Sequence, residues 1–254
     1  MITIIGIAHV INIRNAIERI ISISLPNIIC VELDRQRYEA LSNGELGADM
    51  PFLYRMLSNF QKNVAKKYGS SVGDEMLAAI DAAQKLKLPV AFIDVPSATG
   101  GKTILDSLTF KEKAGLIFSA IGGMFVSKKR IERELQKFQK EPEKFLDAIG
   151  KKYPDIKKVL IDQRDEYMAM NILKLSKKFA HVLAVVGDGH VSGLAKILKN
   201  EGLDIIRLET IRKMLDNDGN INEITARELG FPALSKDSEL NSSMSFDFTW
   251  EQKQ

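Results

Sequence analysis

Short runs of apolar, mostly β-branched residues recur along the chain, each bounded by glycine or polar residues. Such runs are typical of buried β-strands. Because the apolar residues are continuous and do not alternate with polar ones, we expect both faces of each strand to be covered, as in a parallel sheet. The expected strands are Thr3–Gly6, Ile28–Leu33, Val90–Asp94, Val182–Gly187 and Asp204–Leu208.

Between these runs, apolar residues recur at three- and four-residue spacing, which indicates amphipathic helices. The last expected helix begins at Gly193, with Ser192 as its cap and Gly202 as its stop. The other expected helices are Asn12–Ser24, a short helix capped by Asp34 that ends at Leu41, Met50–Lys67 and Gly73–Leu86. This alternation predicts an α/β fold with a mostly parallel central sheet flanked by helices.

The middle of the chain differs from both ends. Residues 105–180 have helical patterning without a convincing strand, which predicts a large α-helical insertion between the third and fourth strands. Residues 1–104 and 181–234 then form the two parts of the α/β core. Residues 235–254 are rich in Ser, Asp and Asn, and we expect a flexible tail, or one that docks its aromatic side chains on a partner.

The longest apolar stretch, residues 114–126, is too short for a bilayer span of about 20 residues, so we expect no transmembrane segment. If the chain forms a homodimer, we expect the contact in this part of the insertion. The net charge of +3 is spread over helix faces, and we expect no nucleic-acid partner. Cys30 is the only cysteine, which together with the lack of a signal peptide indicates a reducing, cytoplasmic setting. Cys30 lies in an apolar run and is expected to pack as a small apolar side chain.

Two segments combine a buried strand, a glycine and a histidine in the same order. They are Gly6-Ile7-Ala8-His9 and Gly187-Asp188-Gly189-His190. Ligands of open parallel sheets bind beyond the carboxyl ends of the strands. The two histidines therefore predict one shared functional site. The third histidine, His181, begins the fourth strand at its amino end, and we expect a structural role for it.

Glu32 follows the second apolar run, so it points toward His9 if the two strands are neighbours. His9, His190 and Glu32 would form a set of two histidines and one carboxylate, which binds divalent metals such as Mn, Co, Zn or Fe. Such an ion lowers the pKa of a bound water and produces a nucleophile. The alternative is a structural glutamate that caps a helix or pairs with Arg35 or Arg37.

A second group of candidates comes from the helical pattern around residues 157–178. Asp165 falls on its apolar stripe with Arg164 beside it, and inward charges are costly unless they are paired or used. Arg164 would bind an anionic substrate group or stabilise an oxyanion, with Asp165 orienting it; the alternative is a structural ion pair. Asp94 is a further ligand, a partner that orients a histidine, or a turn residue before Pro96. For Asp188, helix capping and a place in the site remain open.

These motifs, in this order, resemble the TraB/PrgY/GumN family, which is related to the Tiki proteases and to the erythromycin esterase-like and ChaN-like proteins. The resemblance runs from Met1 to about Arg207, and Ile7 stands where many relatives have threonine. It rests on four segments: Gly6-Ile7-Ala8-His9-Val10, Val31-Glu32-Leu33-Asp34 with Arg35, Arg37 and Tyr38, Arg164-Asp165-Glu166-Tyr167-Met168-Ala169, and Val185-Val186-Gly187-Asp188-Gly189-His190-Val191.

The resemblance implies an α/β core with the paired histidines and the glutamate at one site. From Tiki-like relatives it implies divalent-metal-dependent peptide hydrolysis, and from the TraB/PrgY branch the inhibition of a peptide pheromone. Many longer relatives carry C-terminal transmembrane helices, which we do not expect here.

We therefore expect a metal-dependent hydrolase acting on a peptide or related amide bond, with a peptide or small molecule as substrate. The alternatives are a metal-free hydrolase with a histidine base, similar to the erythromycin esterase-like proteins, and a non-catalytic protein that binds and sequesters a peptide. The expected catalytic residues are Glu32, Arg164 and Asp165, the metal ligands His9, His190 and Glu32, and the substrate-binding residues Arg164, Asp94 and Arg37.

Overall fold

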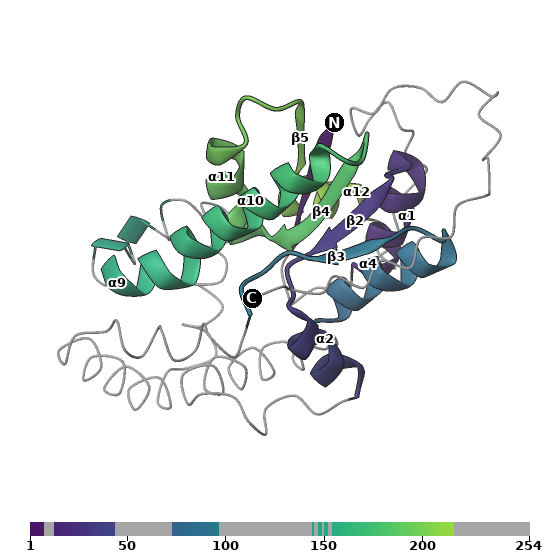
Figure 1. The fold of residues 1–254 in the computed structure, drawn as a ribbon, viewed down its shortest axis with the longest axis horizontal. Coiled ribbons are helices and arrows are strands. Elements are labelled where there is room, and N and C mark those ends of the chain that lie inside the picture. The colour runs from purple at the N-terminus through teal and green to yellow at the C-terminus, as the bar shows by residue number, and fades with distance from the viewer. Residues whose placement is uncertain are drawn as a thin grey trace.

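A computed structural model describes residues 1–7, 13–43, 73–96, 144, 147–148, 150–151 and 154–215. In these residues the strands form one five-stranded sheet in the order β3-β2-β4-β1-β5, and every pair is parallel (Figure 1). The strands are β1 (Ile2–Ile7), β2 (Ile28–Val31), β3 (Val90–Phe92), β4 (Val182–Gly187) and β5 (Leu203–Ile206). The predicted α/β class with a parallel central sheet is confirmed.

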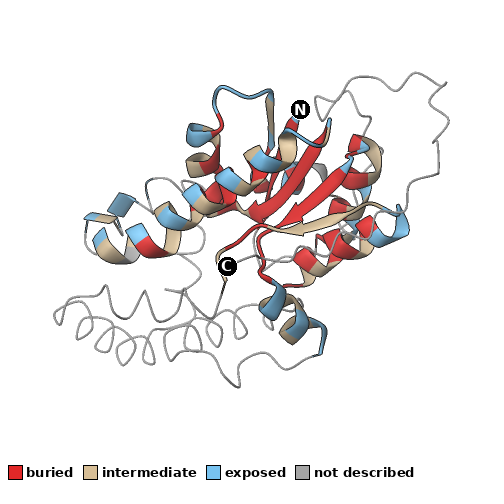
Figure 2. Ribbon diagram, viewed as in Figure 1, coloured by how far each residue is buried: buried red, intermediate tan, exposed pale blue. Residues whose placement is uncertain are grey.

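Two layers of helices cover the sheet, and their buried residues belong to two separate cores. Successive residues of a strand point to opposite faces, so Ile5 and Ile7 join one core while Ile2 and Ile4 join the other. Figure 2 shows the central strands buried along their length. Burial on both faces explains why these runs are continuously apolar.

The helices divide between the two faces. On the first face lie α1 (Arg14–Ser24), α4 (Asp74–Lys85) and α12 (Leu208–Met214). On the second lie α10 (Gln163–Ser176) and α11 (Asp188–Ile197). The short α2 (Arg35–Ser42) follows β2, while α9 (Pro154–Lys157) and the π-helix η1 (Lys158–Asp162) lead into α10.

The neighbouring strands β1 and β4 mark a change of face. The next described helix after β1 is α1 on the first face, whereas α11 follows β4 on the second. In open α/β sheets such a switch point is where ligands bind, beyond the carboxyl ends of the strands. The topology therefore directs attention to the segments that follow β1, β4 and their neighbour β2.

The largest error in the predicted elements concerns the helix after β4. We expected it to begin at Gly193 with Ser192 as its cap and to end near Gly202, but α11 begins at Asp188, directly after the strand, and ends at Ile197. Gly193 lies inside the helix, and the Ser192 hydroxyl contacts Arg207. The backbone enters the helix directly after Gly187, at the end of the strand.

Smaller differences concern the ends of strands. The second strand stops at Val31, two residues earlier than predicted, and the Leu33 N–H then donates to the Val31 carbonyl in a turn. Asp34 caps α2 as predicted, because its carboxylate accepts from the Arg37 N–H at 3.0 Å. The third strand ends at Phe92, before Asp94, and the fifth is Leu203–Ile206 in place of Asp204–Leu208.

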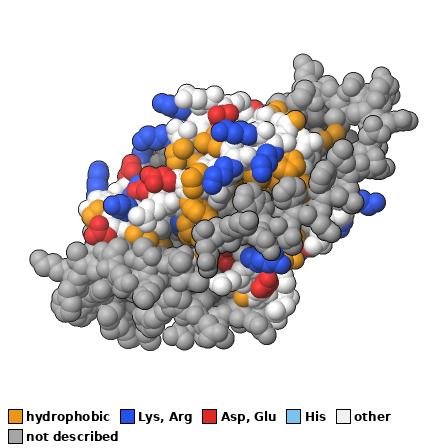
Figure 3. All heavy atoms as spheres, viewed as in Figure 1, with side chains coloured by type: hydrophobic (Ala, Val, Ile, Leu, Met, Phe, Trp, Pro, Cys, Tyr) orange, Lys and Arg blue, Asp and Glu red, His pale blue; other side chains and the backbone are white. Residues whose placement is uncertain are grey.

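Several predictions concern residues outside the described part of the chain: the helix Met50–Lys67, most of the 105–180 insertion with its apolar stretch, and the tail from residue 235. In the part that is described, no helix is long and apolar enough to cross a membrane. Over the described part of the face drawn in Figure 3, basic side chains lie among apolar and acidic ones.

Candidate functional site

Glu32 and His190 come from neighbouring strands and meet beyond the carboxyl end of the sheet. Glu32 follows β2, and its N–H donates to the Val185 carbonyl of β4 at 3.1 Å. The Gly187 N–H, at the start of α11, donates to Glu32 Oε2 at 2.6 Å. The positive end of the α11 dipole thus faces the Glu32 carboxylate and favours its ionised form.

His190 lies in the first turn of α11 with a carboxylate at each ring nitrogen. Its Nδ1 is 2.6 Å from Asp165 Oδ1, and its Nε2 is 3.2 Å from Glu32 Oε1. Burial alone would lower the pKa of His190, but the Glu32 charge and the Asp165 hydrogen bond outweigh it and raise the pKa to about 9. Without another ligand, the imidazole is therefore held as a cation between two anions.

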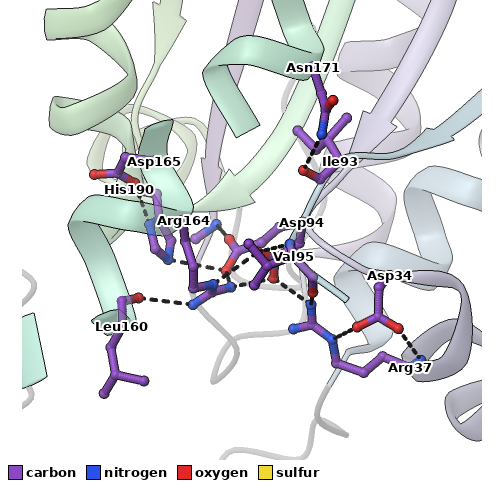
Figure 4. Close-up of polar contacts among 12 residues, drawn as sticks. Asp34, Arg37, Ile93, Asp94, Val95, Leu160, Arg164, Asp165, Asn171 and His190 are labelled. Carbon is purple, nitrogen blue, oxygen red and sulfur yellow. Dashed lines mark hydrogen bonds and ion pairs between the residues drawn. The ribbon is translucent and has the colours of Figure 1, made fainter. Parts of the chain in front are cut away.

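Arg164 connects this pair to a third carboxylate (Figure 4). Its guanidinium donates to Glu32 Oε1 and makes a two-pronged contact with Asp94, from Nε to Oδ1 at 3.0 Å and from Nη2 to Oδ2 at 2.6 Å. The planar guanidinium fits a carboxylate in this way. Nη1 donates to the carbonyl of Leu160 in the π-helix η1 at 3.3 Å.

Asp94 lies between two arginines, and its side chain is 0% exposed. Arg37 Nη2 donates to Asp94 Oδ2 at 2.6 Å and to the Val95 carbonyl at 3.2 Å, while Arg37 Nε donates to Asp34 Oδ2 at 2.5 Å. Asp34, Arg37, Asp94 and Arg164 thus form a chain of alternating charges that leads to Glu32. Figure 4 shows Asp94 between the two guanidinium groups.

The pKa values of the three acids at the centre respond differently to their surroundings. Burial would raise the pKa of Glu32, but the charges of His190 and Arg164 and the Gly187 N–H lower it well below its ordinary range. Burial is likewise outweighed at Asp94, where Arg164 and Arg37 lower the pKa. At Asp165 burial prevails over the His190 hydrogen bond, and the pKa is raised. Glu32 is therefore firmly ionised, while Asp165 binds its proton more readily than an ordinary aspartate.

Consecutive residues of α10 contact different members of the site. Asp165 is buried, as its place on the apolar stripe predicted, and contacts His190, while Arg164 contacts Glu32 and Asp94. The two helices approach closely here because Gly193 lacks a side chain: a Cβ at that position would overlap the Asp165 carboxylate. Gly193 was missed by the sequence reasoning, although a glycine inside a helical pattern is a signal of close packing.

The structure brings together Glu32, Asp94, Arg164, Asp165, His190 and Arg37 in one continuous network of polar contacts. His9 lies outside the described residues. The structural alternative for Glu32 named the wrong partners, since Arg35 pairs with Glu39 on the surface and Arg37 pairs with Asp34 and Asp94. The sequence reasoning gave Asp34 only a capping role, although its three-residue spacing from Arg37 on one helical turn predicts their ion pair.

The donor chemistry at the centre fits a divalent metal ion. His190 Nε2 and Glu32 Oε1 are 3.2 Å apart, a separation open to two ligands that each lie about 2.0–2.2 Å from one ion. Asp165 at Nδ1 orients the ring, as carboxylates do for metal-binding histidines. In the described ranges, no set of three or more His, Cys, Asp and Glu side chains is arranged to hold an ion. Among the described residues, His190 and Glu32 therefore form only a partial set of donors for an ion.

Comparison with known proteins gives two findings. The model of the TraB/PrgY/gumN family matches residues 1–207, which include every residue of the network. An uncharacterized protein of Methanocaldococcus jannaschii, MJ1365, is 34% identical over 226 residues, which cover 83% of this chain and 57% of that protein. The chain thus spans little more than half the length of this relative.

Proposed function

Because this chain belongs to the TraB/PrgY/gumN family, we propose that it is a hydrolase that cleaves a peptide or related amide bond with a divalent metal ion. His190, Glu32 and His9 would hold the ion. The observation that carries the proposal is the position of His190, with one ring nitrogen directed at Glu32 and the other held by Asp165. Carboxylate and imidazole donors at the ends of parallel strands are the pattern of a reaction centre.

When bound, a divalent ion supplies Lewis-acid chemistry toward a carbonyl and activates water. The residues of the chain prepare the place for it. Asp165 fixes the orientation of the His190 ring through Nδ1, and the Gly187 N–H fixes Glu32 through Oε2. Arg164 lies against Glu32 and supplies the cation that would face a substrate carboxylate or a developing oxyanion.

Asp94 and Arg37 complete the proposed substrate side of the site. Asp94 holds the Arg164 guanidinium in its plane by two hydrogen bonds, and Arg37 holds Asp94. Both carboxylate oxygens of Asp94 accept hydrogen bonds from arginines. The role of Asp94 would therefore be to orient Arg164, and the two arginines would contact the substrate.

Metal content tests the proposal directly. The purified chain, dialysed against Mn²⁺, Co²⁺, Zn²⁺ or Fe²⁺, is expected to retain about one ion, and His190→Ala and His9→Ala are expected to lose it. His181→Gln is the matched control, since it removes a histidine at the opposite end of the sheet. Equal, negligible metal content in the parent and in His190→Ala would overturn the metal assignment.

Hydrolysis is tested separately with a mixture of peptides in ¹⁸O-labelled water. A hydrolase places one labelled oxygen in the new carboxyl group of a cleaved product, which mass spectrometry detects. We expect cleavage that Glu32→Gln abolishes. Saturable peptide binding without labelled products would favour sequestration over hydrolysis.

One observation favours a second candidate, a metal-free hydrolase with His190 as base. Arg164 donates to Glu32 Oε1, the same oxygen that faces His190 Nε2, so a protein cation already lies beside the proposed ion position. In that case Asp165 and His190 would act as a dyad that takes a proton from water. Because the imidazole must first lose its own proton, the activity of such an enzyme should rise as the pH approaches about 9. Cleavage that persists after exhaustive chelation would favour this candidate, and loss on chelation with recovery on adding the ion would exclude it.

A further inference from the structure

Asp188 links the two Gly-x-x-His segments physically. In the β1–β4 pair, Gly6 lies opposite Val186 and Ile7 opposite Gly187, so the described start of the first segment lies beside the start of the second. A Cβ on Gly6 would overlap the Asp188 carboxylate and come within 2.9 Å of Val191 Cγ2. The first segment therefore needs its glycine because the second segment places an acid against it.

The Asp188 carboxylate also reaches a third segment. Oδ1 accepts from the Leu208 N–H at the start of α12 at 3.2 Å, and Oδ2 accepts from Arg207 Nη1 at 3.1 Å. Arg207 in addition donates to the Asp188 carbonyl at 3.3 Å and to the Ser192 hydroxyl. One buried side chain thus joins the end of β1, the first turn of α11 and the segment after β5.

We propose that Asp188 is a positioning residue for His190. His190 lies two residues further along the same helical turn, and its ring must meet Asp165 and Glu32 on opposite sides within hydrogen-bond reach. A site of this kind tolerates displacements of only about 0.5 Å, so the turn that carries the ring has to be fixed. β1 and β2 flank β4 in the sheet. Asp188 fixes the turn from the β1 side of β4, whereas Glu32 lies on the β2 side.

An acid after Gly187 is at once a candidate for capping and for chemistry, and only the fold shows that its carboxylate is directed at Gly6 and Arg207. The inference rests on the proposed function in treating His190 as part of the reaction centre, but the position of the ring can be measured without metal or substrate.

Imidazole NMR of the metal-free chain is the test, because the chain has only three histidines and single His→Gln variants assign their signals. In Asp188→Ala we expect the Nδ1 proton resonance of His190, which reports its bond to Asp165, to shift or exchange away, while the His181 signals stay in place. Metal affinity is expected to fall about 10- to 100-fold, as for loss of other outer residues of metal sites. Thr3→Val is the matched control: it alters β1 at the other end and is expected to move only the His181 signals.

Two further variants keep the test decisive if Asp188→Ala does not fold. Arg207→Met removes the partner and leaves Asp188 in place, and we expect a smaller shift of the same His190 resonance. Gly6→Ala is expected to displace the Asp188 carboxylate and so shift the same His190 resonance. The shift caused by Gly6→Ala should be smaller in the Asp188→Ala background than in the parent, because the overlap with the carboxylate is gone.

An unchanged His190 resonance in stable Asp188→Ala or Arg207→Met protein would overturn the positioning role and leave Asp188 a structural residue. That result differs from a failure of the proposed function. If the parent chain binds no metal and cleaves nothing, the His190 resonance still reports whether Asp188 sets the ring.

Discussion

The two described histidines lie at opposite ends of β4, and both are buried. At the amino end, His181 Nε2 is 2.9 Å from the Thr3 hydroxyl, and burial together with the N-terminal ammonium lowers its pKa. At the carboxyl end, two carboxylates raise the pKa of His190 to about 9. A neutral imidazole therefore precedes β4, and a charged one lies in the helix that follows it.

This difference supports the proposal that the reaction centre lies at the carboxyl end of the sheet. Uncharged partners can satisfy a buried imidazole, as the Thr3 hydroxyl and the backbone at Ser24 and Leu25 do for His181. A buried ion network contributes little to stability, because the free energy needed to remove the charges from water offsets most of the energy of their attraction. The network around His190 contains several such charges, and stability alone is a weak reason to assemble them.

The largest expected effect on stability comes from removing the Glu32 carboxylate from the network around His190. Glu32→Ala leaves His190 and Arg164 without their shared partner, and we expect the free energy of unfolding to fall by about 3–5 kcal/mol. Urea unfolding measures it. Glu39→Ala is the control, because Glu39 pairs with Arg35 on the surface and should cost less than about 1 kcal/mol. Equal losses in the two variants would mean that the network is not desolvated.

The pH dependence of stability should differ in sign between the two ends. The pKa of His190 is raised to about 9 from an ordinary value near 6.5, so its contribution is fully present below about pH 6.5 and is lost as the pH rises through about 9. The loss is on the order of 3 kcal/mol in the metal-free chain. His181 has a lowered pKa, so its contribution is present above about pH 6.5 and is lost in acid.

Urea unfolding across this range checks both signs. His190→Gln should flatten the alkaline side of the profile and His181→Gln the acid side. An alkaline slope that His190→Gln leaves unchanged would contradict the charged state of this ring.

The close approach of α10 and α11 gives a more local test. In Gly193→Ala the new methyl group overlaps the Asp165 carboxylate, and we expect a loss of about 1–3 kcal/mol with displacement of Asp165 from His190. Gly202→Ala is the matched control, since a Cβ there meets no atom within 4 Å. Similar thermal unfolding of the two variants would argue against the packing explanation.

The smallest expected effect is at the neutral end. Thr3→Val removes the hydroxyl that faces His181 and keeps the shape of the side chain, so we expect a loss of about 1 kcal/mol. Differential scanning calorimetry measures it. Any change at the site around His190 would show that the two ends of β4 are coupled, which the comparison does not predict.

The pattern of the sequence predicted the parallel sheet well, because continuous apolar runs such as Val182–Val186 have few other uses than a strand covered on both faces. It also predicted that Glu32, Arg164 and Asp165 are candidates, since charges next to apolar runs or on apolar stripes are informative. What it missed depends on contacts between distant segments. The glycine at position 193 signals close packing but does not identify Asp165 as the neighbour, and the bridge from Arg164 to Asp94 leaves no signal in local spacing.

The start of α11 was misjudged for a related reason. Local rules favour a cap at Ser192 over a helix that begins with Asp188 and contains two glycines. Tertiary contacts outweigh that preference: the Gly187 N–H is satisfied by Glu32, and Asp188 is held by Arg207. A helix whose first turn is fixed by side chains from other elements does not need a strong cap of its own.

The strand order also has a consequence for folding of the chain during its synthesis at the ribosome. Ile2 pairs with Val182 on one side and Leu203 on the other, so β1 is synthesised first but finds both neighbours last. At about 5–20 residues per second, roughly 10–40 s pass before these partners emerge. For that time the strand Ile2–Ile7, in which Thr3 is the one polar residue, has to be kept from unwanted pairing. A nascent chain halted before residue 182 would be a natural client for a chaperone.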